Sequence, residues 1–304
     1  MMFLLRRIAW IGITAWVVYT LSFFIMKAVP GGPYARERRL PAIMEERFKE
    51  RYNFDDPWYE QYWNHLSRAV FLDFGPSYKM EDYTVYEVIE QGFPISASLG
   101  ILALSFSLVF GLTAGVVSAS RRNSGIDIGF MAAAALGVAV PSFVLASLAV
   151  IVFVFWLNLL PAGGWGTFRQ LLLPALCLAA PVAAYIARLS RAGMLEVLNL
   201  DYIRTAYAKG LSEPRVVLKH ALRGAIIPVI SYLGPAAAAL LTGSVVIERI
   251  FSIPGMGTHF VEAAMQRDYT LALGMVMVYT VLLLVLNAIV DVSYALIDPR
   301  VKLD

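Results

Sequence analysis

The sequence predicts an all-α integral membrane protein with six transmembrane helices. Hydrophobic residues make up 59% of the 304 residues and charged residues only 15%, and mean hydropathy is +0.67. Soluble globular proteins carry about 25% charged residues. Six apolar runs each have roughly the length of a bilayer's hydrocarbon core, so each should form a helix that satisfies its own backbone; they lie near 8–29, 95–120, 129–158, 171–192, 225–249 and 271–297.

The first run predicts a membrane span that is retained, and residues 1–29 are assigned to it. Arg6 and Arg7 precede an uncharged stretch, Ile8 to Met26, of 19 residues. A signal-peptide core has only 7–15 residues and precedes a cleavage site with small residues. The residues that follow here contain no such site.

Residues 30–93 form one long segment outside the membrane, and their composition predicts a small folded cap. The segment has twelve Asp and Glu against eight Lys and Arg, and it is rich in aromatic residues. Disordered linkers are poor in aromatic residues. Pro41–Tyr52 and Pro57–Val70 are predicted as two short helices, each opened by a proline. Composition leaves open whether the cap only packs on the spans or also docks a partner.

The third run is too long for a straight crossing and carries Pro141 in its middle. Proline kinks or interrupts helices, so we expect a kink there, or a short first helix followed by the span proper. The second run has small residues at every fourth position, which lets another helix approach closely. We expect that face, which includes Gly111 and Gly115, to pack tightly, with a second subunit as one candidate partner.

Polar residues at the ends of two other runs raise the question of an intramembrane site. Asn287 and Asp291 lie four residues apart on the last run, and an acid within a span is a functional candidate by default. The alternative is that Asp291 lies near the cytosolic end and pairs with Arg188 or Arg191. Glu248 and Arg249 are expected at the interface, at the outer end of the fifth run.

Loop charges predict that both termini are cytosolic. The loops and ends on one side hold thirteen Lys and Arg, whereas the short loops on the other side hold only Arg169, Arg249 and Arg267. Short cytosolic loops carry the excess of positive charge. Residues 94–297 are therefore read as a five-helix core and residues 298–304 as a cytosolic tail.

The most basic loop, residues 199–223, predicts a cytosolic pair of helices. Leu200, Ile203, Tyr207 and Leu211 define one apolar face, and Gly210 suits a left-handed helix end. Ser212 suits the start of a second helix. Cations recur there every four residues and repel one another by about 0.2–0.5 kcal/mol per pair, at Arg215, Lys219 and Arg223. An anionic partner is expected, either lipid headgroups beneath an amphipathic surface helix or another protein.

Motifs for common chemistries are absent from the sequence. There is no G-x-x-x-x-G-K-[ST] phosphate loop and no H-E-x-x-H or G-x-S-x-G motif. The histidines fall in different segments, at His65, His220 and His259, and Cys177 is the single cysteine. We therefore expect no catalytic residue and no metal site, and we expect that this chain does not hydrolyse ATP by itself.

Several stretches together resemble the permeases of ABC importers, in particular the oligopeptide/dipeptide permease family and its B-type membrane subunit. The segment from Arg204 to Leu211, continuing to Arg223 and Pro228, resembles that family's EAA loop, although Arg204 stands where the general pattern begins with Glu. The likeness covers nearly the whole chain, through Ala28–Pro33, Asp73–Ser77, Leu160–Trp165 and Asp298–Arg300.

The resemblance implies a type I (MetI-like) permease fold in a bacterial inner membrane. It also implies a second homologous permease subunit, one or two cytosolic ATPases that bind ATP and Mg²⁺, and an extracytoplasmic peptide-binding protein. This chain would hold no cofactor and bind no nucleic acid. The residues implied to couple to the ATPase are Arg204, Thr205, Ala206, Lys209, Gly210, Leu211, Arg215 and Lys219.

Three alternatives stay open. The substrate could be a dipeptide, nickel or another small solute carried by the same family. A secondary transporter is less favoured, because that class uses inverted repeats and a binding site at the midplane of the membrane, and the sequence shows neither. A membrane scaffold whose basic loop binds lipid is the third alternative. Only the first class requires a separate ATPase.

Overall fold

The computed structural model describes residues 2–29, 56–80 and 83–297. Within these ranges every regular element is helical, apart from one antiparallel bridge between Pro76 and Thr84. Five helices are long and apolar enough to cross a membrane, or six if two helices joined at a sharp bend count as one span. The all-α prediction is confirmed for this part of the chain. The predicted helix 41–52 and the tail 298–304 lie outside the described residues.

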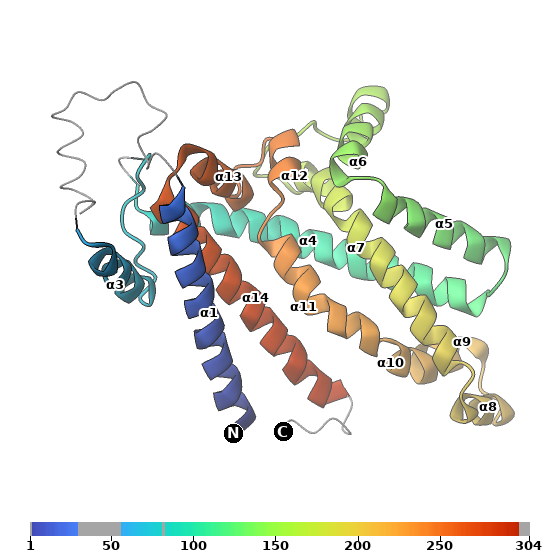
Figure 1. The fold of residues 1–304 in the computed structure, drawn as a ribbon. Helices are drawn as coiled ribbons and strands as arrows, with labels where there is room; N and C mark the ends of the chain where they lie inside the picture. The colour runs from blue at the N-terminus through green and yellow to red at the C-terminus, as the bar shows by residue number, and fades with distance from the viewer. Residues whose placement is uncertain (1, 30–55, 81–82, 298–304) are drawn as a thin grey trace. The chain divides into compact units, whose positions relative to one another are not determined.

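The helices can be followed in chain order in Figure 1. They are α1 Met2–Ala28, α3 Trp58–Ala69, α4 Val85–Ser120, α5 Gly125–Ala139, α6 Ser142–Ala149, the π-helix η1 Val150–Trp156, α7 Phe168–Val197, α8 Asp201–Ala208, α9 Glu213–Arg215, the π-helix η2 Val216–Ala221, α10 Leu222–Ala225, α11 Ile227–Leu241, α12 Val245–Ile250, α13 Met256–Gln266 and α14 Tyr269–Ile297. They divide into two compact units, residues 1–94 with 256–284 and residues 95–255 with 285–304.

In the first unit, α3 packs against α1. The helix begins after Pro57 and ends at Ala69, within a residue of the predicted range at each end. The Tyr62 hydroxyl lies 2.8 Å from that of Thr20 on α1. Its ring also packs edge-on to Phe23, with centroids 5.4 Å apart. A polar contact and an aromatic contact therefore fix α3 on the first helix.

The loop after α3 is bound to the start of α14 by a buried carboxylate. Asp268 is 1% exposed. It accepts hydrogen bonds from the hydroxyls of Ser77 and Thr270 and from the backbone N–H of Leu271 at 3.1 Å. A carboxylate suits this position because the first N–H groups of a helix have no intrahelical partner. Asp268 thus caps α14 and anchors the loop with one side chain.

The stability of the first unit should depend on pH through His65 on α3. Burial, together with the charge of Arg68, lowers the pKa of His65 below its usual 6.5. As pH falls, the unfolded chain therefore takes up this proton before the folded chain does. The free energy of unfolding keeps its full value above the usual pKa of histidine and decreases as pH falls below it. Between about pH 7.5 and about pH 5.5, melting temperature should fall further for wild type than for His65→Gln. Thermal melts in detergent measure this; equal falls would contradict it.

The third apolar run of the chain, which lies in the second unit, is broken at Pro141, as predicted. Helices α5 and α6 meet there at an angle of 107°, which is visible in Figure 1. Val140 is extended, with φ −85° and ψ 123°. A residue before proline is driven out of the helical region by the proline ring, which accounts for the break. The run therefore consists of two helices of different direction.

Helices α4 and α7 meet along a seam of small residues. A Cβ at Gly111 would lie 2.7 Å from the carbonyl oxygen of Ala183, and one at Gly115 only 1.9 Å from Ser190 Oγ. Ser107 adds a hydrogen bond to the carbonyl of Ala179 at 3.2 Å. The predicted close approach is thus made to a helix of the same chain.

Gly115→Ala should therefore destabilise the protein, although alanine normally favours helix. The added methyl group forces α4 and α7 apart, and overpacking of this kind costs about 1–3 kcal/mol. Gly129→Ala is the matched control, because a Cβ at this position on α5 meets nothing within 4 Å. Thermal melts should show a lower midpoint for Gly115→Ala only. Equal midpoints for the two variants would contradict the close approach of α4 and α7 at Gly115.

The fifth run is interrupted and buries an acid that was expected at the interface. Helix α11 ends at Leu241, and Gly243, with φ +83°, turns the chain into α12. Glu248 is completely buried within the chain and accepts a hydrogen bond from Ser96 Oγ at 2.8 Å. Cβ atoms at Gly243 and Gly255 would clash with its carboxyl group, at 2.2 and 2.6 Å. Two glycines therefore make the space that accommodates it.

Candidate coupling surface

The basic segment forms the predicted helix, turn and helix directly after α7 (Figure 1). Helix α8 ends at Ala208, and Gly210, two residues later, has a φ of +77°, which confirms the expected left-handed conformation. The N–H of Gly210 donates to the carbonyl of Tyr207 at 2.9 Å, and that of Leu211 to Ala206 at 3.4 Å. This pair of bonds is the Schellman motif, which satisfies carbonyls at a helix end. It sets the direction in which the chain leaves α8.

The second helix starts where predicted but is not a regular α-helix. Ser212 precedes α9 and its carbonyl accepts the Val216 N–H at 3.0 Å, but its side chain makes no cap bond. From Val216 to Ala221 the chain forms the π-helix η2, and α10 follows. A π-turn holds more residues per turn than an α-helix. The predicted single α-helix is therefore corrected to a short α–π–α sequence.

A small hydrophobic core packs against the buried side of this segment. It joins the end of α7 to α8, η2 and α10, and its buried members are Ala119, Met194, Val197, Ile203, Ala206, Val216, Val217, Ala221 and Ala225. Two of the four residues predicted to form the apolar face of α8 do so: Ile203 is buried in this core and Leu211 packs against it. The prediction is wrong for Leu200 and Tyr207, which are 45% exposed. Ala206, not Tyr207, shares the buried side with Ile203.

The outer face combines exposed apolar and aromatic side chains with basic ones. Leu200, Tyr202, Tyr207 and Leu218 are between 45% and 61% exposed. Arg204, Thr205, Lys209, Gly210, Arg215, Lys219 and Arg223 are exposed on the same segment. We call these residues together the coupling surface. Tyrosine and arginine are enriched at protein interfaces, so the surface has the composition of a docking site.

The cations of the second helix have no acidic partner among the described residues. Arg204 lies 3.4 Å from Asp201, but both side chains are largely exposed, so the contact contributes little. No ion pair of the described residues involves Arg215, Lys219 or Arg223. Their mutual repulsion is therefore not offset within this part of the chain, as expected for a surface that meets an anionic partner.

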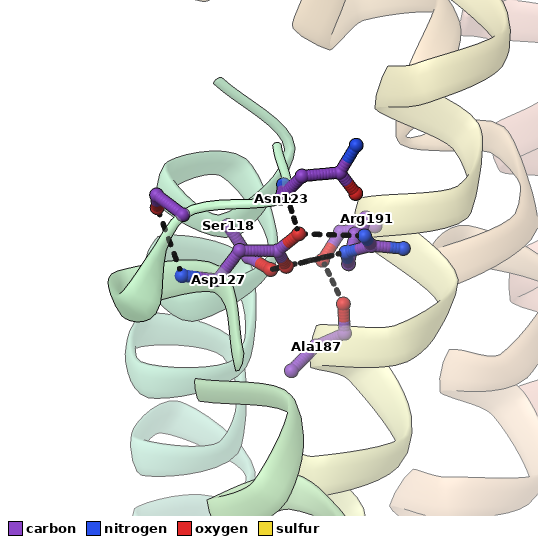
Figure 2. Close-up of polar contacts among 7 residues, drawn as sticks. Ser118, Asn123, Asp127, Ala187 and Arg191 are labelled. Atoms are coloured by element: carbon purple, nitrogen blue, oxygen red, sulfur yellow. Dashed lines mark hydrogen bonds and ion pairs between the residues drawn. The ribbon is translucent and has the colours of Figure 1, made fainter. Parts of the chain in front are cut away.

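The other predicted polar residues lie away from this surface. Asn287 on α14 packs against α11, where a Cβ at Gly234 would lie 2.5 Å from its Oδ1. For Asp291, the proposed partner Arg191 instead binds Asp127 through two hydrogen bonds, at 2.7 and 2.8 Å (Figure 2). The Arg188 guanidinium lies over the ring of Tyr185. Gly111 and Gly115 belong to the α4–α7 seam.

Asp127 was missed by the sequence analysis, although a signal for it exists. Ser124 and Asp127 have the spacing of a capping box before an apolar run, and the Ser124 hydroxyl accepts the Asp127 N–H at 3.3 Å. Arg191 could have been matched to it only with knowledge of the fold. Among the described residues, no group of three or more His, Cys, Asp or Glu could hold a metal ion.

Residues 111–303, more than half of the chain, match the family model described as "Binding-protein-dependent transport system inner membrane component". The chain belongs to this family. Its members are multi-pass permeases of the inner membrane, and the several long apolar helices found here fit that description.

Relatives of this permease match over nearly their full length. It is 45% identical to the oligopeptide transport system permease protein OppB of Haemophilus influenzae, over 95% of each chain. It is 43% identical to the dipeptide transport system permease protein DppB of Bacillus subtilis, over 99% and 98%. Identity to OppB of Escherichia coli K12 is 42% over 99% of each.

Solved structures show the same fold at low sequence identity. The inward-facing MetNI methionine ABC transporter aligns with a TM-score of 0.56 at 16% identity, over 69% of this permease and 96% of that chain. An amino acid ABC transporter crystallised with histidines aligns with a TM-score of 0.53, at 15% identity, over 75% and 96%. The predicted MetI-like permease fold is confirmed.

Proposed function

We propose that this permease is a membrane subunit of an ATP-driven peptide importer and forms half of the translocation pathway. The observation that carries the proposal is the coupling surface: an exposed, basic and aromatic helix pair mounted on the end of α7. Relatives named for oligopeptide and dipeptide transport match nearly the whole chain. Because the sequence has no phosphate-binding loop, the energy comes from another protein.

The coupling surface provides a route for that energy into the membrane helices. Ile203 and Ala206 of α8 share one core with Met194 and Val197 of α7. Close-packed interiors transmit displacement because they contain few voids. A cytosolic ATPase that closes on ATP and moves α8 therefore also moves the end of α7. In this account Arg204, Thr205, Lys209, Arg215 and Lys219 face the ATPase, while Ala206, Gly210 and Leu211 shape the helix end.

The remaining parts of the proposal concern assembly and orientation. A second homologous permease completes the pathway, one or two kinds of ATPase bind ATP and Mg²⁺, and an extracytoplasmic binding protein delivers peptide. Both termini and the coupling surface lie in the cytosol, in agreement with the positive-inside rule. Residues 30–93 lie outside, where they either pack on the spans or contact the binding protein.

Dipeptides remain the second candidate substrate, because a relative named for dipeptide transport is 43% identical. Proteoliposomes that contain the complex copurified with this chain test both candidates, with labelled peptides of two to six residues. ATP-dependent uptake of peptides supports the proposal, and the preferred length decides between the substrates. ATP-independent uptake, or copurification without any ATPase, contradicts it and favours a secondary transporter or a scaffold.

A further inference from the structure

A partly buried ion-pair cluster joins three helices of the second unit, as Figure 2 shows. Asp127, in the first turn of α5, is 3% exposed. It accepts hydrogen bonds from Arg191 on α7 at 2.7 and 2.8 Å, from the backbone N–H of Asn123 at 2.9 Å and from the hydroxyl of Ser118 on α4. One carboxylate therefore holds the ends of α4 and α5 to one point on α7. We call Ser118, Asp127 and Arg191 the brace.

The geometry of the brace restricts how α7 can move. The guanidinium of Arg191 meets both carboxylate oxygens in a planar fork, which fixes orientation as well as distance. Arg191 Nε also donates to Ser118 Oγ at 3.1 Å. Rotation or sliding of α7 against α5 would break both hydrogen bonds from Arg191 to Asp127 together. Buried ion pairs add little net stability compared with apolar packing, so this restriction is the main physical effect of the brace.

The brace lies next to the core that supports the coupling surface. Met194 is one turn after Arg191, about 4.5 Å further along the axis of α7, and is completely buried in that core. Ala119, the neighbour of Ser118 on α4, belongs to the same core. A displacement of α8 therefore reaches the brace almost directly, from the side of α7 and from the side of α4.

We propose that the brace positions α7 so that a displacement of the coupling surface moves α4 and α5 together with α7. The inference rests on the proposed function and assigns Asp127, Arg191 and Ser118 a role in it as positioning residues. Without the fork, α5 no longer follows when a displacement of α8 moves α7. The ATPase would continue to hydrolyse ATP while fewer of its cycles carried peptide.

The test compares Arg191→Lys, which keeps the charge but loses the fork, with Asp127→Asn and with the double variant Asp127→Asn/Arg191→Gln. Each is purified as the complete transporter complex, and peptide uptake and ATP hydrolysis are measured in the same proteoliposomes. We expect the number of peptides carried per ATP to fall about tenfold in each single variant, the size of effect that loss of a charged hydrogen bond produces. The double variant should fall no further than the worse single one, because the residues act through each other.

Arg169→Lys is the matched control. This arginine lies on the same helix at its other end, is exposed and donates to the carbonyl oxygen of Leu159 at 2.8 Å. It should leave the peptide-to-ATP ratio at the wild-type value. If the brace variants lower only yield or melting temperature and keep that ratio, the brace is merely structural and the inference is overturned. If the wild-type complex shows no ATP-driven peptide uptake, the proposed function itself fails.

Discussion

Gly210→Val is expected to abolish peptide uptake while the bound ATPase continues to hydrolyse ATP. Gly210 has a φ of +77°, and a left-handed conformation costs an L-residue with a side chain roughly 1–2 kcal/mol. The two bonds that end α8 depend on that conformation. Valine should therefore change the direction in which the chain leaves α8 and misplace the coupling surface. Uptake and ATP hydrolysis, measured on the same purified complex, check this result.

Two further variants make the test of Gly210 specific. Asparagine tolerates the left-handed region better than other residues, so Gly210→Asn should retain most of the uptake. Gly166→Val places the same side chain at another positive φ, +117°, where a Cβ also meets nothing within 4 Å, but far along the chain from α8. It should leave coupling intact. Normal uptake by Gly210→Val would remove the coupling role from this helix end.

Reversing three charges on η2 and its flanks is expected to release the ATPase from the complex. Arg215, Lys219 and Arg223 are exposed and have no acidic partner among the residues that the structure describes. An exposed ion pair contributes up to about 1 kcal/mol, so losing three weakens binding about a hundredfold. The triple variant Arg215→Glu/Lys219→Glu/Arg223→Glu should lose the ATPase on purification. Quantitative gels of the purified complex measure the amount retained.

The same experiment separates a protein partner from a lipid partner. Arg121→Glu/Arg122→Glu reverses two exposed cations on the loop after α4, which lie outside the coupling surface. That variant should keep its ATPase. If the triple variant also keeps its ATPase and instead binds less well to vesicles of anionic phospholipid, the basic residues serve the membrane and not a subunit.

Features that depend on local chemistry were predictable from the sequence. The break at Pro141 follows from the steric effect of proline on Val140, and the left-handed end of α8 follows from Gly210. Helix α3 was placed almost to the residue, because Pro57 marks its start. Apolar runs of bilayer length located the long helices, although α4 begins ten residues before its predicted start at 95.

Features that depend on tertiary contacts were not predictable. Glu248 is buried because Ser96, more than 150 residues away in sequence, and two glycines enclose its carboxyl group. Arg191 pairs with Asp127 on a different helix, and charge and distance along the chain do not show which helices are neighbours. The π-helix η2 has no sequence signal that distinguishes it from an α-helix. The residues predicted to couple to an ATPase came from a resemblance, whereas their exposure required the structure.

The seam between α4 and α7 has a mechanical consequence. Where Gly111 and Gly115 meet α7, the backbone of α4 lies directly against carbonyl oxygens of α7 and against the branched side chain of Ile186, which leaves little room for one helix to shift past the other. The two helices are therefore expected to shift together along the seam, and α7 is about 45 Å long. Bending is expected within α7 at Pro174 and Pro181, where proline removes a helical hydrogen bond, and at the break at Pro141. A displacement that enters at the α8 end of α7 is therefore shared with α4 along the seam, and the prolines are the points at which α7 can change direction.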